Sequence, residues 1–529
     1  MITAQYFFGR NIRVYADRPL TIDNMLKKTV DKHPHQEAVV MDTYRQTYKE
    51  LDHTVEELAS QMQVVSNIQK GDRVGLLLMN RPEFIHIVFA CARIGAIAVP
   101  LNTRLSEDEL AYMLNHSGVS LLFSESAFLD TISNLQSNYQ WEKTWEPIVV
   151  DEEEVSETKY SDYISSPLKQ KRIRVDVMEE DPLFIMYTSG TTGTPKGAIG
   201  SHMGVIHSAI NYKEVLQEKQ DVRTLIAVPL FHVTGLIGQM FYMVLIGGTS
   251  VLLKKYQTEP FINALTEENI TFLFNVPTIY VMMMSHPSFN EQSYPHLRTL
   301  AYGGAPMSKE TIAQLRELLP GIKLHNAYGA TETSSPTTIM PVEYDDNKFS
   351  SVGLPVPVGE VQIVNEAGQE LPDGEVGELW IKGPMVVQGY WRNEEANKKS
   401  FEDGYWKSGD MAYRDDEGFV YIMDRKKDMI NRGGEKIFSA EVENVLYGHP
   451  AVLEAAIVGI PDQLFGEQVK AYVVIKEQEN QAPHPEEIKE FLKEKIADYK
   501  VPQYVEFVIE LPRNPGGKIL KNKLVQMHG

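Results

Sequence analysis

The chain has 529 residues, of which 43% are hydrophobic and 23% are charged, a composition typical of folded globular proteins. Because a single core stops growing above roughly 250–300 residues, the sequence predicts at least two domains. The net charge of −21 argues against nonspecific nucleic-acid binding, which needs phosphate neutralisation by Lys and Arg, and the single cysteine, Cys91, excludes an intrachain disulfide.

The N-terminal part alternates helical stretches with short apolar strands. Residues 21–34 have helical spacing, and residues 84–96 have the spacing of a buried crossover helix. Strands are predicted at 72–80, 96–101, 120–124, 183–190, 225–230, 249–253 and 271–277. This alternation indicates βαβ units and a mostly parallel sheet.

The uncharged run Thr234–Leu253 is just long enough to span a bilayer. Gly247 and Gly248 divide it, so we expect a buried helix followed by a short apolar strand, with no integral membrane span. The N-terminus lacks a long apolar segment preceded by basic residues. We therefore expect no secretory signal and a cytoplasmic protein.

The character of the chain changes in its last third. From about Ser351, Gly and Pro become dense, and strands at 360–364 and 377–382 predict a β-rich subdomain. A last unit from about Asp428 contains predicted strands at 454–460 and 470–475 and then an amphipathic helix at 485–499. Two basic islands in this acidic chain are suited to polyanionic ligands: Arg425–Lys436 and Arg513–Lys523.

The segment Tyr187–Ala198, YTSGTTGTPKGA, directly follows an apolar strand. Small residues let backbone N–H groups approach phosphate oxygens, hydroxyls add donors, and Lys196 supplies a charge. Pro195 and Gly197 stand where a Walker A loop has its last Gly and its Ser/Thr, so the segment is not a Walker A loop. No two glycines of the chain are separated by a single residue, which excludes a dinucleotide-binding fingerprint. The alternative to a phosphate loop is an ordinary surface loop.

The string TSGTTGTPKG resembles the signature of the adenylate-forming (AMP-binding) superfamily of acyl-CoA synthetases, peptide-synthetase adenylation domains and firefly luciferases. Further family motifs follow in the expected order: PLFHVTG at Pro229–Gly235, YGGAP at Tyr302–Pro306, NAYGATET at Asn326–Thr333, GEVGELWIKGP at Gly374–Pro384, YWKSGDMA at Tyr405–Ala412, DRKKDMINRGGEKI at Asp424–Ile437 and LPRNPGGKILKNKL at Leu511–Leu524. The resemblance covers nearly the whole chain and favours the branch of acyl-CoA synthetases and fatty-acid–CoA ligases.

The resemblance implies an ATP-dependent acid–CoA ligase. Such an enzyme activates a carboxylic acid to acyl-AMP with release of pyrophosphate and then transfers the acyl group to CoA. The implied fold is α/β, with a large N-terminal adenylation domain, residues 1–426, of two βαβ-type sheets plus a β-rich subdomain. A small mobile α+β C-terminal domain, residues 427–529, is implied to rotate about a hinge at Lys427. Mg²⁺ is the expected cofactor, and ATP, CoA and a small carboxylic acid are the expected substrates.

The resemblance also implies a nucleotide site. Glu332, a hard oxygen donor, would bind Mg²⁺ with Thr188 as a second metal contact. Thr331 would contact the α-phosphate, and Asp410 and Arg425 would hold the ribose. Lys518 would bridge the acid carboxylate and the α-phosphate, countering the charge between two anions. The other nucleotide-site positions are Ser189, Gly190, Thr191, Thr192, Lys196, Gly303, Gly304, Ala305, Asn326, Tyr328 and Gly329.

Each role has a plainer alternative. Asp410 in its SGD sequence could cap a turn, Tyr328 could be a core residue, and Glu332 or Lys518 could be a solvated charge. By the same resemblance, the CoA site would contain Gly433 and Gly434, where the pantetheine arm passes the backbone, and Lys436, which would meet a CoA phosphate. Spacing alone does not establish this CoA site.

The identity of the acid is narrowed by two positions. His232, counted with the catalytic residues, stands where amino-acid-activating relatives carry Asp, and no carrier domain is expected within the eleven residues after Lys518. Short-acid relatives carry Trp in place of Gly329, so we expect room for an acid larger than acetate or propionate, shaped in part by the Met-rich run Thr278–Pro287. Medium-chain, long-chain and aryl acids stay open.

Two alternative functions also stay open. One is an acyl-AMP ligase that loads a carrier protein instead of CoA, and the other is a catalytically silent acyl- or nucleotide-binding protein. The presence of Lys196, Glu332, Asp410 and Lys518 speaks against the silent protein. The sequence carries no signal for an oligomeric state.

Overall fold

The computed structural model describes residues 1–141, 145–151, 157–168, 170–188, 194–218, 221–305, 307–476, 483–513 and 519–528. Within it the chain divides into two compact units, Met1–Val361 with Ile381–Trp406, and Gln362–Trp380 with Lys407–Gly529. The α/β class, the two sheets of the first unit, the β-rich region and the separate α+β C-terminal region are confirmed. The hinge at Lys427 and the mobility of the C-terminal domain stay predictions.

The first sheet has seven strands in the order β11-β10-β6-β5-β7-β8-β9. Neighbouring strands run parallel except for the β10–β11 hairpin. The strands are β5 (Arg73–Leu77), β6 (Ile97–Pro100), β7 (Val119–Ser124), β8 (Pro147–Val149), β9 (Thr158–Lys159), β10 (Pro182–Thr188) and β11 (Lys196–Ser201). The four strands predicted in this region are confirmed, although β5 ends at Leu77 instead of residue 80, and residues 189–190 of the strand predicted at 183–190 lie outside the described residues.

The second sheet has nine strands in the order β18-β17-β16-β15-β14-β12-β13-β3-β4. Its middle strands run parallel, and antiparallel partners close it at both edges. The strands are β3 (Glu37–Met41), β4 (Tyr44–Thr47), β12 (Arg223–Ile226), β13 (Thr249–Leu252), β14 (Phe272–Asn275), β15 (Thr299–Gly303), β16 (Lys323–Ala330), β17 (Ser335–Ile339) and β18 (Leu354–Pro355). A separate hairpin pairs β1 (Ile2–Phe7) with β2 (Arg10–Tyr15).

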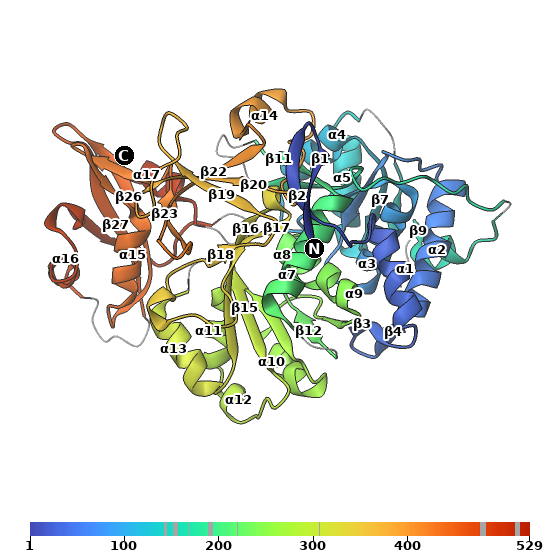
Figure 1. Ribbon diagram of the computed structural model, residues 1–529, viewed down its shortest axis with the longest axis horizontal. Coiled ribbons are helices and arrows are strands. Elements are labelled where there is room, and N and C mark those ends of the chain that lie inside the picture. The colour runs from blue at the N-terminus through green and yellow to red at the C-terminus, as the bar shows by residue number, and fades with distance from the viewer. Residues whose placement is uncertain are drawn as a thin grey trace. The chain divides into compact units, whose positions relative to one another are not determined.

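Helices connect and cover these strands (Figure 1). The crossover helix predicted at 84–96 is α3, and nearly every one of its side chains is buried. The helices of the first unit include α1 (Ile22–Lys32), α2 (Tyr48–Val64), α3 (Pro82–Ile94), α4 (Glu107–Ser117), α5 (Leu129–Asn138), α6 (Tyr160–Ser165), α7 (His202–Leu216), α8 (Val233–Gly235), α9 (Tyr242–Ile246), α10 (Thr258–Glu267), α11 (Pro277–Ser285), α12 (Pro287–Asn290), α13 (Lys309–Leu318) and α14 (Glu394–Ser400).

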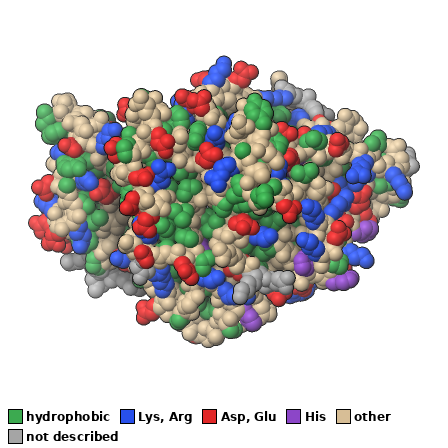
Figure 2. Space-filling model, in the orientation of Figure 1, with side chains coloured by type: hydrophobic (Ala, Val, Ile, Leu, Met, Phe, Trp, Pro, Cys, Tyr) green, Lys and Arg blue, Asp and Glu red, His purple; other side chains and the backbone are tan. Residues whose placement is uncertain are grey.

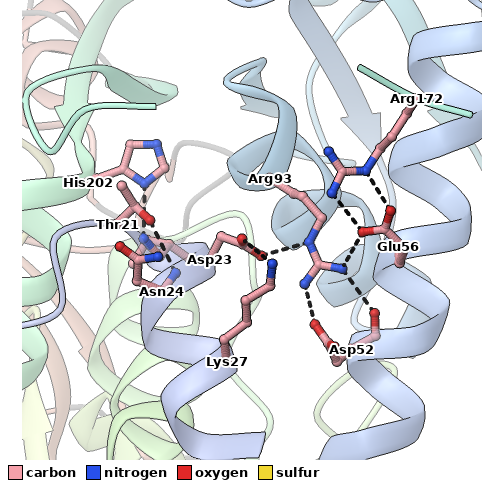
Figure 3. Close-up of polar contacts among 10 residues, drawn as sticks. Thr21, Asp23, Asn24, Lys27, Asp52, Glu56, Arg93, Arg172 and His202 are labelled. Carbon is pink, nitrogen blue, oxygen red and sulfur yellow. Dashed lines mark hydrogen bonds and ion pairs between the residues drawn. The ribbon is translucent and has the colours of Figure 1, made fainter. Parts of the chain in front are cut away.

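A buried arginine fastens α1 and α2 to α3. The side chain of Arg93 is 1% exposed and forms ion pairs with Asp23 on α1 and with Asp52 and Glu56 on α2 (Figure 3). Arg172 forms a further ion pair with Glu56, from its Nε atom to the Oε1 atom at 2.6 Å. Desolvation alone would raise the pKa of Glu56, but the hydrogen bond from Arg172 and the two arginine charges lower it. The network joins three helices through complementary charges, in addition to the apolar core that they share.

The apolar run Thr234–Leu253 folds as predicted. It forms the end of α8, a π-helical segment Leu236–Phe241, then α9, and after Gly247 and Gly248 the strand β13. Its residues up to Val244 are largely buried in the core. Across the described residues, every helix is too short or too polar to cross a membrane.

The later part of the chain contains two smaller sheets. One has the order β19-β20-β22-β21 with β23 beside β22, and its strands are β19 (Glu360–Val364), β20 (Gly377–Lys382), β21 (Phe401–Glu402), β22 (Tyr405–Arg414) and β23 (Val420–Arg425). The other has the order β25-β24-β27-β26 with β28 beside β27, and its strands are β24 (Ile430–Arg432), β25 (Glu435–Ile437), β26 (Val452–Asp462), β27 (Gly466–Ile475) and β28 (Tyr504–Phe507).

Helices α15 (Ser439–Tyr447), α16 (Pro485–Lys493) and α17 (Lys521–Gln526) accompany the last sheet. Side chains of α15 and α16 share a core with β26 and β27, whereas Leu524 of α17 packs in a second cluster with Tyr472. The amphipathic helix predicted at 485–499 ends earlier, at Lys493, and a 3₁₀ turn follows at Asp498–Lys500. Acidic and basic side chains are interspersed on the face shown in Figure 2.

Candidate active site

The strand ends β10 and β11 flank the Ser/Thr/Gly-rich loop. Thr188, the last residue of β10, lies opposite Lys196, the first residue of β11, in their antiparallel ladder. This pairing closes the loop at its base and brings a hydroxyl and an ammonium to the same end of the sheet. The loop positions Ser189, Gly190, Thr191 and Thr192 lie outside the described residues.

Glu332 lies in a 3₁₀ turn, Thr331–Thr333, between β16 and β17. Its carboxylate is 8% exposed, and its Oε1 atom accepts hydrogen bonds from Thr188 (3.3 Å) and from the Tyr390 hydroxyl (2.9 Å). Thr188 belongs to the seven-stranded sheet and Glu332 follows a strand of the nine-stranded sheet. The two predicted metal contacts therefore meet where the two sheets approach each other. Thr331, next to Glu332, is half-buried.

The backbone after Glu332 is held in an unusual conformation. Ser334 and Ser335 have positive φ angles of 48° and 95°, which non-glycine residues adopt rarely and at a cost. The Thr333 hydroxyl bonds with Ala330 and with the Ser335 carbonyl, and the Tyr212 hydroxyl bonds with the Ser335 side chain. These contacts fix the turn that carries Glu332.

Strands β15 and β16 carry the predicted adenine-site positions. Gly303 ends β15 beside Ala327 of β16, and a Cβ at Gly303 would overlap the Ala327 carbonyl oxygen. Gly304 has a φ of +78° and is exposed, as is Ala305. The glycine pair is thus explained by close strand approach and by a left-handed turn.

On β16, Asn326 is buried and its amide donates to the Ser351 carbonyl (3.0 Å). Tyr328 is half-buried. Gly329 is exposed and follows a register shift in the β16–β17 ladder. A Cβ at Gly329 would overlap the backbone carbonyl of Ser335. The close approach of two strands is thus sufficient to require glycine there, independently of any acyl pocket.

His232 lies just before α8, with its ring 4.7 Å from that of Phe231. The residue is exposed to solvent, yet surrounding protein desolvates the imidazole and lowers the pKa of His232 to about 4, and the charge of Arg104 adds to the effect. His232 is therefore neutral at pH 7.

In the Met-rich helix α11, Met283 and Met284 are buried, whereas Val281 and Met282 are about 45% exposed.

Asp410 and Arg425 lie in the second unit. They are directly opposite each other on β22 and β23, and the guanidinium of Arg425 contacts the buried carboxylate of Asp410 at 2.7 Å. The Asp410 amide also donates to the Ser408 hydroxyl (3.0 Å). Asp410 is therefore a buried, strand-borne carboxylate, and the alternative of a turn cap is excluded by its position within β22.

The remaining predicted positions follow β23. Lys427 is exposed in a turn in which the amides of Asp428 and Met429 donate to the Arg425 carbonyl. Gly433 and Gly434 form the two-residue loop between β24 and β25, and both have positive φ, as a type I′ hairpin turn requires. Lys436 is exposed, with its ammonium 3.9 Å from Glu366. Lys518 lies outside the described residues.

Tyr390 is the residue that sequence reasoning missed. It is 4% exposed, its hydroxyl contacts Glu332, and the Lys196 ammonium lies 5.2 Å from the centre of its ring. Desolvation, followed by the charge of Glu332, raises the pKa of Tyr390, so the phenol stays protonated and donates. In sequence, a tyrosine in the string VQGYW is indistinguishable from a core aromatic.

Comparison with known proteins gives a consistent result. The family model for AMP-binding enzymes matches residues 26–391, and the model for their C-terminal domain matches residues 441–518. A 2-succinylbenzoate–CoA ligase of Bacillus licheniformis is 36% identical over 504 residues, covering 95% of this chain and 99% of that protein. A feruloyl-CoA synthase of an Amycolatopsis species is 34% identical, covering 94% of this chain and 96% of that protein.

Solved structures agree with the sequence relatives. The o-succinylbenzoate–CoA synthetase of Bacillus subtilis in complex with its acyl-adenylate intermediate superposes with a TM-score of 0.84 at 31% identity, over 94% of this chain and 97% of that one. The same synthetase has also been solved with ATP and a magnesium ion, and superposes with a TM-score of 0.82 at 30% identity, over 94% of this chain and 98% of that one. The chain therefore belongs to the family of AMP-binding enzymes, in its acyl-CoA synthetase branch.

Proposed function

We propose that this acyl-CoA synthetase activates a carboxylic acid larger than propionate to an acyl-adenylate and then transfers the acyl group to CoA. A fatty acid of medium or long chain and an aryl acid are both candidates. Relatives named for aryl acids and a long-chain-fatty-acid–CoA ligase of Mycobacterium tuberculosis, 32% identical over 514 residues, support this range. The single cysteine, buried in α3, is consistent with a reducing compartment, and we place the reaction in the cytoplasm.

The observation that carries the proposal is the meeting of Thr188 and Glu332 beside Lys196. A triphosphate is a dense negative charge, and a carboxylate can attack its α-phosphorus only when that charge is masked. Lys196 supplies a cation at the base of the loop, and Glu332 with Thr188 supplies oxygen ligands for a second cation. Thr331, which is adjacent to Glu332 and half-buried, would contact the α-phosphate.

The side chains around Glu332 fit a magnesium ion that arrives with ATP. Mg²⁺ keeps several waters and is usually bound through one or two carboxylates together with substrate phosphates. Glu332 and Thr188 offer one carboxylate and one hydroxyl. Within the described ranges, no three or more His, Cys, Asp or Glu side chains are grouped so as to hold a metal alone. This donor set suits Mg²⁺ shared with a triphosphate and does not suit a resident metal cage.

The other roles come from the family and stay proposals. Asp410 with Arg425 binds the ribose, and Lys518 delivers the charge that offsets two anions during adenylation. Lys427 is the hinge between residues 1–426 and 427–529. Gly433, Gly434 and Lys436 line the path of CoA, although the positive φ angles of both glycines are already explained by the hairpin turn.

A panel of acids tests the proposal. The protein is incubated with ATP, Mg²⁺ and acetate, octanoate, palmitate or a cinnamic acid, with and without CoA, while pyrophosphate and thioester are measured separately. We expect pyrophosphate release with a larger acid and thioester only with CoA. Preference for acetate would overturn the acid class. Acyl-AMP that accumulates with CoA, and is consumed only by a carrier protein, would establish the alternative acceptor.

A further inference from the structure

The backbone around Tyr390 is tied to both sides of the proposed magnesium site. The Ile199 amide donates to the Gly389 carbonyl (3.0 Å), and the Trp391 amide donates to the Gly197 carbonyl (2.7 Å). The Val387 amide donates to the Glu332 carbonyl (2.9 Å). Residues 387–391 thus run beside β11, which begins at Lys196, and also hold the turn that carries Glu332.

The direction of the Tyr390 hydroxyl proton follows from its neighbours. The indole nitrogen of Trp406 lies 3.4 Å from the Tyr390 oxygen, and an indole N–H can only donate. The phenol oxygen is therefore the acceptor on that side, and its own proton is directed to Glu332 Oε1 at 2.9 Å. Thr188 donates to the same oxygen, so two donors orient the Glu332 carboxylate.

The Tyr390 ring has a second contact with the site. The Lys196 ammonium lies 5.2 Å from the ring centre, within the range of a cation–π interaction, and the edge-on contact with Phe401 at 5.7 Å keeps the ring in place. A lysine with four rotatable bonds loses much conformational freedom when it binds a phosphate. A ring that already restrains the ammonium reduces that loss.

We propose that Tyr390 is a positioning residue for nucleotide binding. Its hydroxyl orients the carboxylate of Glu332, and its ring restrains the ammonium of Lys196. This inference rests on the proposed function, because it assigns to Tyr390 the support of residues that bind Mg²⁺ and phosphate there. Partners of metal ligands fix ligand orientation, and their loss typically lowers metal affinity about 10–100-fold. In this role Tyr390 acts through Glu332 and Lys196, the two side chains that it contacts.

Equilibrium binding of a non-hydrolysable ATP analogue, measured by calorimetry with and without Mg²⁺, tests this role without relying on activity. Tyr390→Phe keeps the ring and removes only the hydroxyl. We expect its Kd for the magnesium complex to rise about 10-fold, while the Kd without Mg²⁺ changes less than about twofold. Tyr390→Leu removes the ring as well and should weaken both, since Lys196 then loses its restraint.

Three further variants make the result decisive. Tyr421→Phe is the matched control, because its hydroxyl also donates to a carboxylate, that of Asp415 at 3.1 Å, and it should bind like the wild type. Glu332→Gln tests the underlying function, and unchanged magnesium dependence there would refute the metal role of Glu332. If Glu332→Gln loses magnesium dependence but Tyr390→Phe does not, the positioning role of Tyr390 is wrong. Thermal melting monitors the folding of each variant. If Tyr390→Phe is unstable, Trp406→Phe replaces it, because it removes the indole that donates to the Tyr390 hydroxyl. Its Kd for the magnesium complex should rise, but by less than about 10-fold.

Discussion

Arg425 contacts the carboxylate of Asp410 at 2.7 Å, and the two residues are direct partners across β22 and β23. The family resemblance implies that both residues hold the ribose, and the ladder places them side by side. The Asp410 side chain is 6% exposed, whereas the Arg425 side chain is 43% exposed. Arg425 therefore compensates the charge of Asp410 and orients it.

Asp410→Asn should weaken ATP binding, because an amide is a poorer acceptor for two ribose hydroxyls than a carboxylate. Hydrogen bonds to charged groups contribute about 1.5–3 kcal/mol, so we expect KM for ATP to rise roughly 10–100-fold. Dideoxy-ATP, which lacks both hydroxyls, is the diagnostic substrate. The wild type should prefer ATP strongly, and Asp410→Asn should use the two nucleotides almost equally. A variant that still discriminates like the wild type would assign the ribose to other residues.

Gly329 gives a prediction in which the structure revises the sequence interpretation. Because a Cβ at this position overlaps the Ser335 carbonyl, Gly329→Ala and Gly329→Trp should both shift the β16–β17 hairpin and lower the melting temperature by several degrees. The loss should be similar for both, since the clash arises at the first side-chain atom. A Gly329→Trp protein that melts like the wild type and turns to acetate would instead support the pocket interpretation.

The strands and helices were largely predictable because the pattern of apolar and polar residues in a short stretch of sequence indicates each of them. The alternation around β5, α3 and β6 needs only about 30 residues to be recognised. The contacts that build the site are not local. Tyr390 is 58 residues from Glu332 in the sequence, and Thr188 is 144 residues from it. No periodic pattern in the sequence predicts contacts between residues so far apart.

The family motifs predicted part of these contacts, since they assign both Thr188 and Glu332 to the metal, and the structure brings these two residues together. They gave no reason to single out Tyr390, whose hydrogen-bond partner Glu332 is distant in the chain. For Gly329 they offered a pocket explanation for what the close approach of two strands already requires. A sequence motif identifies positions, but it does not show whether the residue at a position is needed for the backbone conformation or for the chemistry of the site.

Two buried histidines of α7 predict acid sensitivity. His207 accepts the Tyr15 amide and His202 accepts the Ile22 amide (3.3 and 3.2 Å), so both must be neutral. Desolvation lowers the pKa of each to about 4, while unfolded histidine keeps about 6.5. Since the unfolded chain then binds more protons, the free energy of unfolding falls by up to about 1.4 kcal/mol per histidine per pH unit as pH drops from about 6.5 to 4.

The matched test of that sensitivity is His207→Gln. Glutamine can accept from Tyr15 and donate to the Met203 carbonyl, as His207 does, but does not titrate. Melting temperatures at pH 7 and pH 5 should differ less in this variant than in the wild type. His53→Gln, at an α2 side chain that is 75% exposed, should leave the difference unchanged. Equal acid sensitivity in all three proteins would place the titrating groups elsewhere.

The Lys427 turn gives a prediction for the proposed hinge. The amides of Asp428 and Met429 both donate to the Arg425 carbonyl, so the backbone at Lys426 forms a helix-like turn. A proline at position 427 disfavours this conformation of the residue before it. Lys427→Pro should therefore stiffen and strain this segment, reducing thioester formation more than pyrophosphate release. Lys427→Ala keeps the turn and should reduce neither by more than about twofold. Equal losses of both half-reactions in the proline variant would argue against a hinge at this position.

Lys518→Ala should abolish most adenylation while sparing thioester formation from acyl-AMP supplied ready-made. The reason is positional: in the proposed function, Lys518 belongs to the C-terminal domain, and that domain would bring it to the nucleotide only for the first half-reaction. Its charge would offset the repulsion between the acid carboxylate and the α-phosphate. Losing one such donor costs about 2.7–4 kcal/mol, or roughly 10²–10³ in rate, by analogy with oxyanion-hole deletions.

Lys521→Ala is the matched control for that loss. Lys521 lies three positions further on, and its ammonium is held by Glu443 at 2.7 Å within the C-terminal domain, so its replacement should affect stability before it affects either half-reaction. Pyrophosphate release and thioester formation are measured separately for both variants, with melting temperatures as the folding check. If Lys518→Ala folds normally yet loses both half-reactions to the same degree, the lysine serves the structure of the domain and the proposed division of labour is wrong.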